Sequence, residues 1–136
     1  MVMTQESDYA VRIVEILAKS NQKIDAHTIS EQAEVPLRFA LKILRKLVAG
    51  GLMVSYKGAH GGYRLAREPA KITLRQVIES VEGPYMLNRC QQGEYCCTHT
   101  DGCRFHEIYD EISAMVRAKL DSYNFENLDE KEKKDK

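Results

Sequence analysis

The sequence lacks an excess of charge of either sign. Lys and Arg together number 20, Asp and Glu also number 20, and the formal net charge is zero. This balance excludes a protein that is basic overall, so any DNA-binding surface must be local. No apolar run approaches the roughly 18 residues that a membrane span requires, and residues 1–8 have neither the charged nor the apolar region of a signal peptide. We therefore expect a single cytoplasmic domain with no membrane partner.

Apolar periodicity and capping residues predict three helices in the first third of the chain. They cover 4–19, 26–33 and 36–47, and the last one stops at Gly50-Gly51. The tight connection between the second and third helices is typical of a helix-turn-helix. The third helix carries basic residues that contact either base edges and phosphates or only solvent. These residues are Arg38, Lys42, Arg45 and Lys46.

Two strand-like runs follow at 52–56 and 63–66, and a glycine-rich connection joins them. A hairpin directly after a helix-turn-helix is a wing, and this order favours DNA binding more than the charge alone does. The glycines would let the wing approach the minor groove closely. The wing residues that we expect at the DNA are Lys57, His60, Gly61, Gly62 and Arg64. The fold class is therefore mainly α with a small β-hairpin, with a winged helix-turn-helix domain over 1–84.

The rest of the chain has a different pattern. A fourth helix is predicted over 73–81, and residues 85–104 then hold all four cysteines without any periodicity, which indicates a functional loop. Over 105–128 apolar residues recur at steps of three and four, which predicts a long helix whose apolar stripe needs a partner. We expect a homodimer through Ile108, Ile112, Met115, Val116 and Leu120. Residues 129–136 are nearly all charged and should be disordered.

The four cysteines are Cys90, Cys96, Cys97 and Cys103. In a reducing cytoplasm such thiols are metal ligands or reactive groups before they are disulfides. Thiolates five or six residues apart in a flexible loop can surround an iron–sulfur core, and the spacing differs from that of a zinc ribbon. Three alternatives stay open: a zinc site of three cysteines with His106, a thiol redox switch at the adjacent pair, and inert thiols.

Five segments together resemble one protein family. They are 8–12, 42–52, 57–66, 72–74 and 81–84, with the sequences DYAVR, KILRKLVAGGL, KGAHGGYRLA, ITL and VEGP. From about residue 3 to residue 128 the chain resembles the Rrf2 family of bacterial winged-helix transcription regulators, in particular its IscR-like and NsrR-like iron–sulfur branch. The resemblance implies a DNA-binding regulator, expected to be a repressor, whose iron–sulfur cluster senses nitric oxide, redox conditions or iron supply.

The resemblance also implies a ligand set. Three cysteines would hold the cluster, and they match Cys90, Cys96 or Cys97, and Cys103. His106 as the fourth ligand would be similar to the IscR-like arrangement with a 2Fe-2S cluster. Asp8 from the partner's first helix would be similar to the NsrR-like arrangement with a 4Fe-4S cluster. Each has a plainer interpretation, because Asp8 suits the first turns of a helix and His106 can simply begin the long helix.

The expected mechanism links the cluster to DNA. Assembly of the cluster would order the cysteine loop and change the separation of two recognition helices on a pseudo-palindromic operator in double-stranded DNA, with half-sites about one turn apart. A zinc- or thiol-based regulator with the same DNA-binding half is the alternative. An enzyme or electron carrier has little support, because the sequence shows no phosphate-binding glycine loop and no pairing of a nucleophile with a base.

Overall fold

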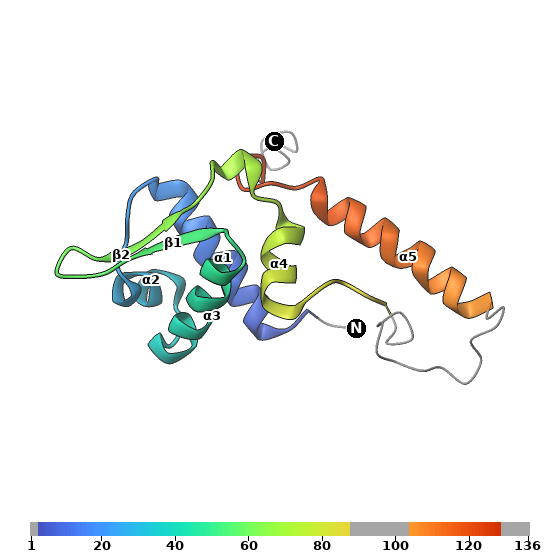
Figure 1. The fold of residues 1–136 in the computed structure, drawn as a ribbon, viewed down its shortest axis with the longest axis horizontal. Helices are drawn as coiled ribbons and strands as arrows, with labels where there is room; N and C mark the ends of the chain where they lie inside the picture. Colours follow the sequence, from blue (N-terminus) through green and yellow to red (C-terminus); the bar gives the residue numbers. More distant parts are fainter. Residues whose placement is uncertain (1–2, 88–103, 129–136) are drawn as a thin grey trace.

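A computed structural model describes residues 3–87 and 104–128, which form five α-helices, one short 3₁₀ helix and a two-stranded hairpin (Figure 1). In chain order the elements are α1 (Gln5–Ser20), α2 (Ala26–Ala33), α3 (Leu37–Ala49), β1 (Met53–Tyr56), β2 (Gly62–Leu65), η1 (Pro69–Lys71), α4 (Leu74–Glu82) and α5 (Arg104–Asp121). The mainly α fold with a small hairpin is confirmed. The predicted bounds of α2 match the structure, and those of α1, α3, α4 and both strands shift by one or two residues.

Short-range sequence signals set the starts of three helices. Thr4, Asp25 and Thr73 each accept a hydrogen bond from the backbone N–H three residues ahead, at the starts of α1, α2 and α4. Such caps satisfy N–H groups that have no partner inside the helix. The side chain of Gln76 reaches back to the backbone of Thr73 and completes a capping box. Helix α4 ends at Gly83, whose φ of +85° suits glycine.

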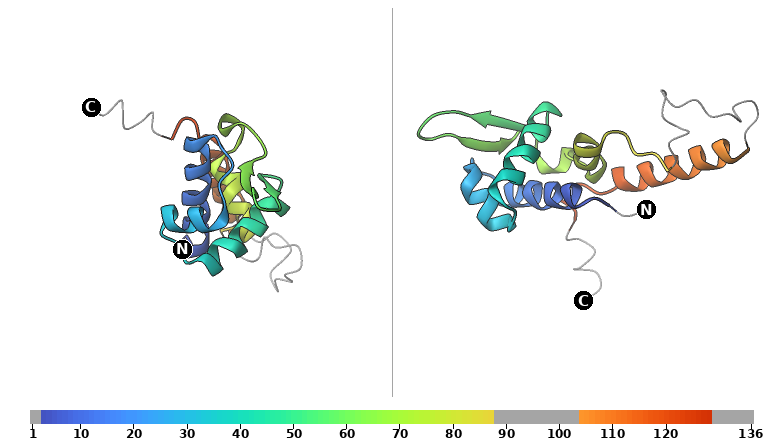
Figure 2. Two further views of the ribbon diagram at one scale, coloured as in Figure 1. Left: turned by 90° about the vertical axis from the view of Figure 1, so that its left-hand side faces the viewer. Right: turned by 90° about the horizontal axis from the view of Figure 1, so that it is seen from below.

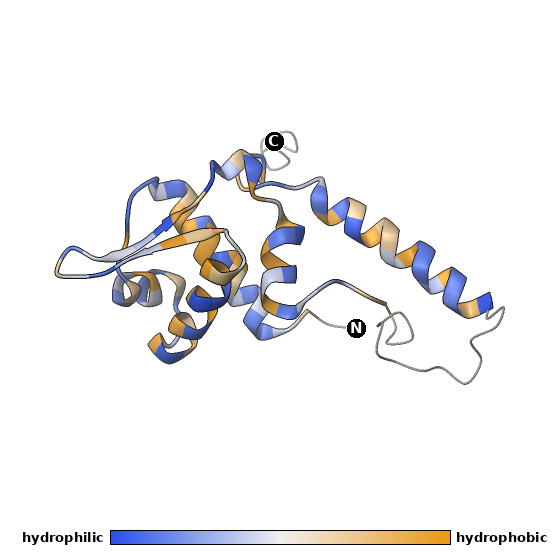
Figure 3. Ribbon diagram, viewed as in Figure 1, coloured by the Kyte–Doolittle hydropathy of each residue, from blue (hydrophilic) through white to orange (hydrophobic). Residues whose placement is uncertain are grey.

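The hydrophobic core lies where the first four helices meet. Hydropathic bands alternate along these helices, as expected for amphipathic elements with one buried face (Figure 3). Burying each Leu or Ile side chain stabilises the folded state by about 1.5–3 kcal/mol. This buried cluster therefore fixes the orientation of α3 and determines which of its faces is exposed. The most fully buried residues are Ala10, Ile13, Val14, Leu17, Ile29, Ala40, Ile43, Leu44, Leu47, Ile72 and Val77.

The hairpin is joined to the segment between α1 and α2 through the outer edge of β2. Strands β1 and β2 pair in antiparallel register from Met53↔Leu65 to Tyr56↔Gly62. The other edge of β2 pairs with the α1–α2 connection, because Ile24 and Tyr63 exchange two backbone hydrogen bonds of 3.0 and 2.8 Å. The wing is therefore held beside the helix-turn-helix at its base.

The C-terminal residues return to the N-terminal helices, which the sequence did not predict. Helix α5 extends away from these helices (Figures 1 and 2) and ends at Asp121, so the helix expected over 105–128 was too long. The backbone oxygen of Tyr123 then accepts a bond of 2.9 Å from Leu74 N, and Phe125 N lies 3.2 Å from the carbonyl oxygens of Pro69 and Ile72. Phe125 is only 8% exposed.

Two expectations fall on residues that the structure does not describe. The four cysteines and the charged tail belong to 88–103 and 129–136, which lie outside the described residues. Among the helices of 3–87 and 104–128, none is long and apolar enough to cross a membrane.

Candidate functional site

Helix α3 exposes cations on the face opposite its buried one. The buried face carries Ala40, Ile43, Leu44 and Leu47. Arg38, Lys42 and Arg45 recur at steps of four and three, so they share the exposed face. Together with Phe39 and Leu41, these three cations line an open hollow of about 550 Å³. The structure thus brings three of the four basic residues of α3 onto one surface.

Lys46 is placed differently from the other basic residues of α3. Its Nζ lies 3.2 Å from Oε1 of Glu6 and 3.4 Å from the carbonyl oxygen of Val81, so it joins α3 to α1 and α4. Lys42 also approaches Glu6, at 3.4 Å, but its side chain is 61% exposed against 35% for Lys46. Burial raises the pKa of Glu6, but hydrogen bonds from Lys46 and Lys42 outweigh this effect and hold the pKa below its ordinary value. Lys46 therefore contributes first to the packing of α3.

A second carboxylate joins the end of α4 to the start of α1. Oε1 of Glu82 accepts a hydrogen bond of 2.6 Å from the hydroxyl of Ser7 and another from the hydroxyl of Thr4. Ser7 is fully buried. Burial raises the pKa of Glu82, but the bonds from Ser7 and Thr4 outweigh it and lower the pKa. The chain leaves α4 for the cysteine segment just after this contact.

The residues that lead into the cysteine segment contact both flanking helices. Tyr85 N donates to Oε2 of Glu79 on α4 at 2.7 Å, and Arg117 of α5 donates to the Tyr85 carbonyl at 2.6 Å. Leu87 N donates to the hydroxyl of Ser113, a buried residue of α5, at 2.9 Å. Sequence reasoning missed this set, because its members are far apart in the chain.

The opposite ends of α4 and α5 are also joined. Arg75 forms ion pairs with Glu79 at 2.9 Å and with Asp121 at 2.7 Å, and Thr73 donates to Asp121 at 3.2 Å. Helix α5 is thus connected to the winged-helix domain near both ends of α4.

The charged side chains of the wing are exposed, whereas two of its glycines are required because the backbone passes too close for a side chain. A Cβ on Gly61 would lie 2.4 Å from the carbonyl oxygen of Tyr56, and one on Gly62 would lie 2.7 Å from that of Ile24. Sequence reasoning also missed Lys23, whose Nζ lies 5.1 Å from the ring centre of Tyr56 and adds a cation beside the wing. The expected DNA-contacting side chains of the wing, Lys57, His60 and Arg64, are all exposed.

Two of the expected cluster ligands lie in the described part of the chain. His106 is in the first turn of α5 with Nε2 3.4 Å from Asp110, and Asp8 is on α1 with Oδ2 3.0 Å from Arg12. Both side chains are more than two-fifths exposed and so remain accessible. Within 3–87 and 104–128 no three His, Cys, Asp or Glu side chains group together to hold a metal. The thiol donors Cys90, Cys96, Cys97 and Cys103 are outside the described residues.

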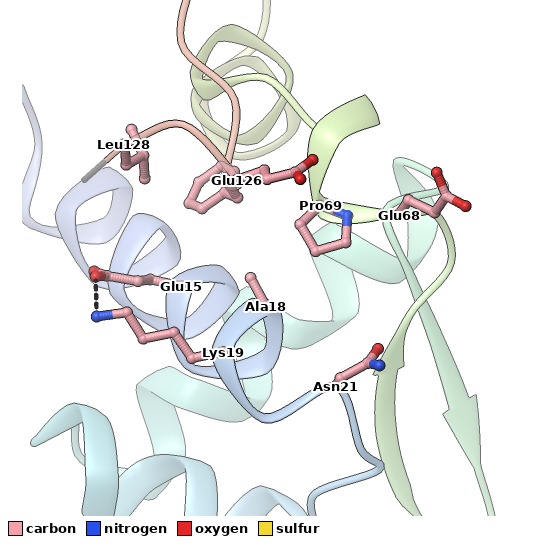
Figure 4. Close-up of a pocket in the computed structure, with 9 residues that line it drawn as sticks. Glu15, Ala18, Lys19, Asn21, Glu68, Pro69, Glu126 and Leu128 are labelled. Atoms are coloured by element: carbon pink, nitrogen blue, oxygen red, sulfur yellow. Dashed lines mark ion pairs between the residues drawn. The ribbon is translucent and has the colours of Figure 1, made fainter. Parts of the chain in front are cut away.

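A separate cleft of about 540 Å³ lies between α1, η1 and the C-terminal residues (Figure 4). Glu15 and Lys19 on its wall pair with each other at 2.9 Å. The charged side chains that line it are three glutamates and this lysine. The lining residues are Glu15, Ala18, Lys19, Asn21, Glu68, Pro69, Phe125, Glu126 and Leu128.

The arrangement of helix-turn-helix, wing and long C-terminal helix matches a known family. The Rrf2 model, described as an iron-dependent transcriptional regulator, matches residues 3–131. The chain belongs to the Rrf2 family. This membership confirms the resemblance on which the sequence analysis relied.

Relatives and solved structures agree with the assignment to Rrf2. The regulator IscR of Xenorhabdus nematophila is 29% identical over 130 residues, which cover 94% of this chain and 79% of that protein. Protein aau3 of Rhizobium meliloti is 32% identical, with 94% and 84% covered. The structure of CymR, the global cysteine regulator of B. subtilis, superposes with a TM-score of 0.75 at 25% identity and covers 94% of this chain and 95% of that one. This Rrf2 protein is a DNA-binding transcription regulator and not an enzyme, as the sequence predicted.

Replacing Glu82 by Gln should lower the free energy of unfolding by about 1 kcal/mol at neutral pH, because Thr4 and Ser7 then donate to a neutral, partly exposed group. The folded pKa of Glu82 lies below its ordinary value of 4.5. The stabilisation is therefore complete above that value and is lost as the pH falls through the folded pKa. Urea denaturation of both proteins across this range should show the difference vanishing in acid.

Glu126→Gln, at an exposed position of the C-terminal segment, is the control and should match the wild type throughout. A Glu82→Gln difference that stays constant from neutral to acid pH would contradict the role of the carboxylate.

Proposed function

We propose that this Rrf2 protein is a cytoplasmic, homodimeric repressor whose affinity for an operator in double-stranded DNA depends on an iron–sulfur cluster held by its cysteine segment. One observation carries the proposal. Three cations share the exposed face of α3, and the wing that follows α3 is also charged. In the same chain the four cysteines lie in sequence between α4 and α5, the two helices that contact residues 85–87.

The DNA-binding surface of the proposal is α3 with the wing. In winged-helix proteins a recognition helix enters the major groove, and its N-terminal residues contact base edges. Arg38, Lys42 and Arg45 would contact base edges or phosphates there. The wing would place Lys57, His60 and Arg64 beside the phosphates or the minor groove. Because Lys46 already binds Glu6 and Val81, its substitution would weaken the packing of α3 before it weakens DNA contacts.

A second copy of the chain would cover the outer face of α5. Four large apolar side chains recur there at steps of three, four and three, and a single chain leaves them 37–66% exposed. The other face carries Ser113 and Arg117, which bind residues 85–87. An uninterrupted apolar stripe with helical spacing is the surface that packs against another helix. The exposed residues are Phe105, Ile108, Ile112 and Met115, and Val116 and Leu120 extend the stripe as half-buried residues.

The donor chemistry fits an iron–sulfur cluster. Thiolates are the ligands of such clusters, and the four thiols fall within 14 residues directly before α5. Three cysteines would bind it with His106 or Asp8 of the partner subunit, and the cluster would supply a centre that reacts with nitric oxide or oxygen and depends on iron supply. The chain itself would connect the cluster to the helices, because residues 85–87 bind both α4 and α5.

The runner-up is a regulator that senses through zinc or through its thiols. The adjacent Cys96-Cys97 pair favours a thiol switch. The short spacing of Cys103 and His106 favours a zinc site with three cysteines and one histidine. Both would use the same DNA-binding surface.

An anaerobic ultraviolet–visible spectrum, with iron, sulfide and zinc assayed on the same sample, distinguishes these functions. We expect visible absorbance and matched iron and sulfide, and Cys90→Ala or Cys103→Ala should abolish them. Comparing His106→Ala with Asp8→Ala then identifies the fourth ligand, and Cys96→Ala with Cys97→Ala identifies the middle cysteine. A colourless protein that contains zinc, or that binds no metal after anaerobic reconstitution, would exclude the cluster.

Sedimentation equilibrium tests the dimer. The wild type should give twice the 15.5 kDa mass of the chain. Ile112→Asp should give a monomer, because a carboxylate in the covered stripe would be buried without a partner. Glu111→Ala, at the neighbouring exposed position, should leave the dimer intact. A wild-type monomer, or a dimer that survives Ile112→Asp, would refute the assignment of this face.

A further inference from the structure

An aromatic side chain is exposed on the helix that the proposal places in the major groove. Phe39 lies in the first turn of α3 and is 51% exposed. No aromatic ring in the described part of the chain stacks on it. Removing a large apolar side chain from water lowers the free energy. An exposed Phe at this position therefore indicates a contact that the isolated chain does not make.

The surroundings of Phe39 indicate the chemistry of that contact. It lines the hollow on α3 together with Arg38, Lys42 and Arg45. Three cations around an apolar ring favour a polyanion that also carries an apolar group. They do not favour an apolar protein surface. In the major groove the 5-methyl group of thymine is the apolar feature of the base edges, and Phe is one of the side chains that contact it.

We infer that Phe39 is a specificity-determining residue that contacts a thymine methyl group in each half of the operator. The inference rests on the DNA-binding function and adds a base preference to it. Arg38, Lys42 and Arg45 supply affinity through phosphates or polar base edges, whereas Phe39 distinguishes thymine from the other bases at one position.

The test first selects bound sequences from random double-stranded DNA with the full-length protein purified anaerobically. Each thymine of the selected operator is then replaced by uracil, which removes only the methyl group. For the wild type, one thymine in each half-site should be sensitive, with affinity falling about fourfold per replacement, the worth of one buried methyl group. Phe39→Ala should bind more weakly to the thymine operator and should show no further loss on the uracil operator.

Two variants keep the test interpretable. Phe39→Leu keeps an apolar side chain, so part of the sensitivity to uracil should remain. Leu37→Ala is the matched control, because Leu37 is 40% exposed in the same turn of α3 but does not line the hollow. It should keep the full sensitivity of the wild type at the same thymine. Thermal melts confirm that all variants fold.

The outcomes separate this inference from the proposed function. If no sequence is enriched by the selection, the operator-binding function and the inference both fail. If an operator is enriched but no thymine responds to uracil, or if Phe39→Ala keeps the wild-type response, DNA binding stands and the role of Phe39 is refuted.

Discussion

A carboxylate at the start of α1 joins α3 to α1 and α4 beside the apolar core that fixes the direction of α3. Glu6 lies 3.2 Å from Lys46 and 3.4 Å from Lys42, and Lys46 also reaches the carbonyl oxygen of Val81 at 3.4 Å. Three helices therefore meet at one charged contact next to the apolar core. Glu82 strengthens the same junction, because it accepts hydrogen bonds from α1 at the end of α4. The end of α4 and helix α3 are therefore both in contact with the first turn of α1.

In the proposed regulation this junction would matter, because the cysteine segment begins beside it. Tyr85 and Leu87 bind Glu79, Arg117 and Ser113, so the start of the segment contacts α4 and α5 together. A sensor in this segment can bias DNA affinity only if its states differ in their contacts with these helices. The contacts of residues 85–87 with α4 and α5 are the ones that would have to differ, and the proposed dimer along α5 would set the spacing of the two α3 helices.

The zero net charge means that attraction of such a regulator to DNA would depend on local groups of cations. Three cations of α3 share one exposed hollow on a chain whose net charge is zero. Phosphate contacts release counterions, so the logarithm of the affinity should fall linearly with the logarithm of the salt concentration, with a slope set by the number of cations that contact phosphates. Specificity would then depend on base contacts, and Phe39 adds an apolar one to the polar set.

Much of the fold could be predicted because its signals are local. Capping residues such as Thr73 and the turn at Gly83 set helix ends, and the helix that carries Arg38, Lys42 and Arg45 could be placed from Pro36 and Gly50-Gly51. Contacts between distant residues could not be predicted in this way. Helical spacing alone did not show that Lys46 binds Glu6, 40 residues away, or that Phe125 packs against η1. The expected thiol ligands lie outside the described residues, so the ligand set stays a prediction.

The most direct test of the link between sensor and surface is the operator affinity of one preparation with its cluster and after the cluster is removed, at a single salt concentration. The account predicts affinities that differ about tenfold or more, as coupled sites typically do. Equal affinities of the two forms would contradict it.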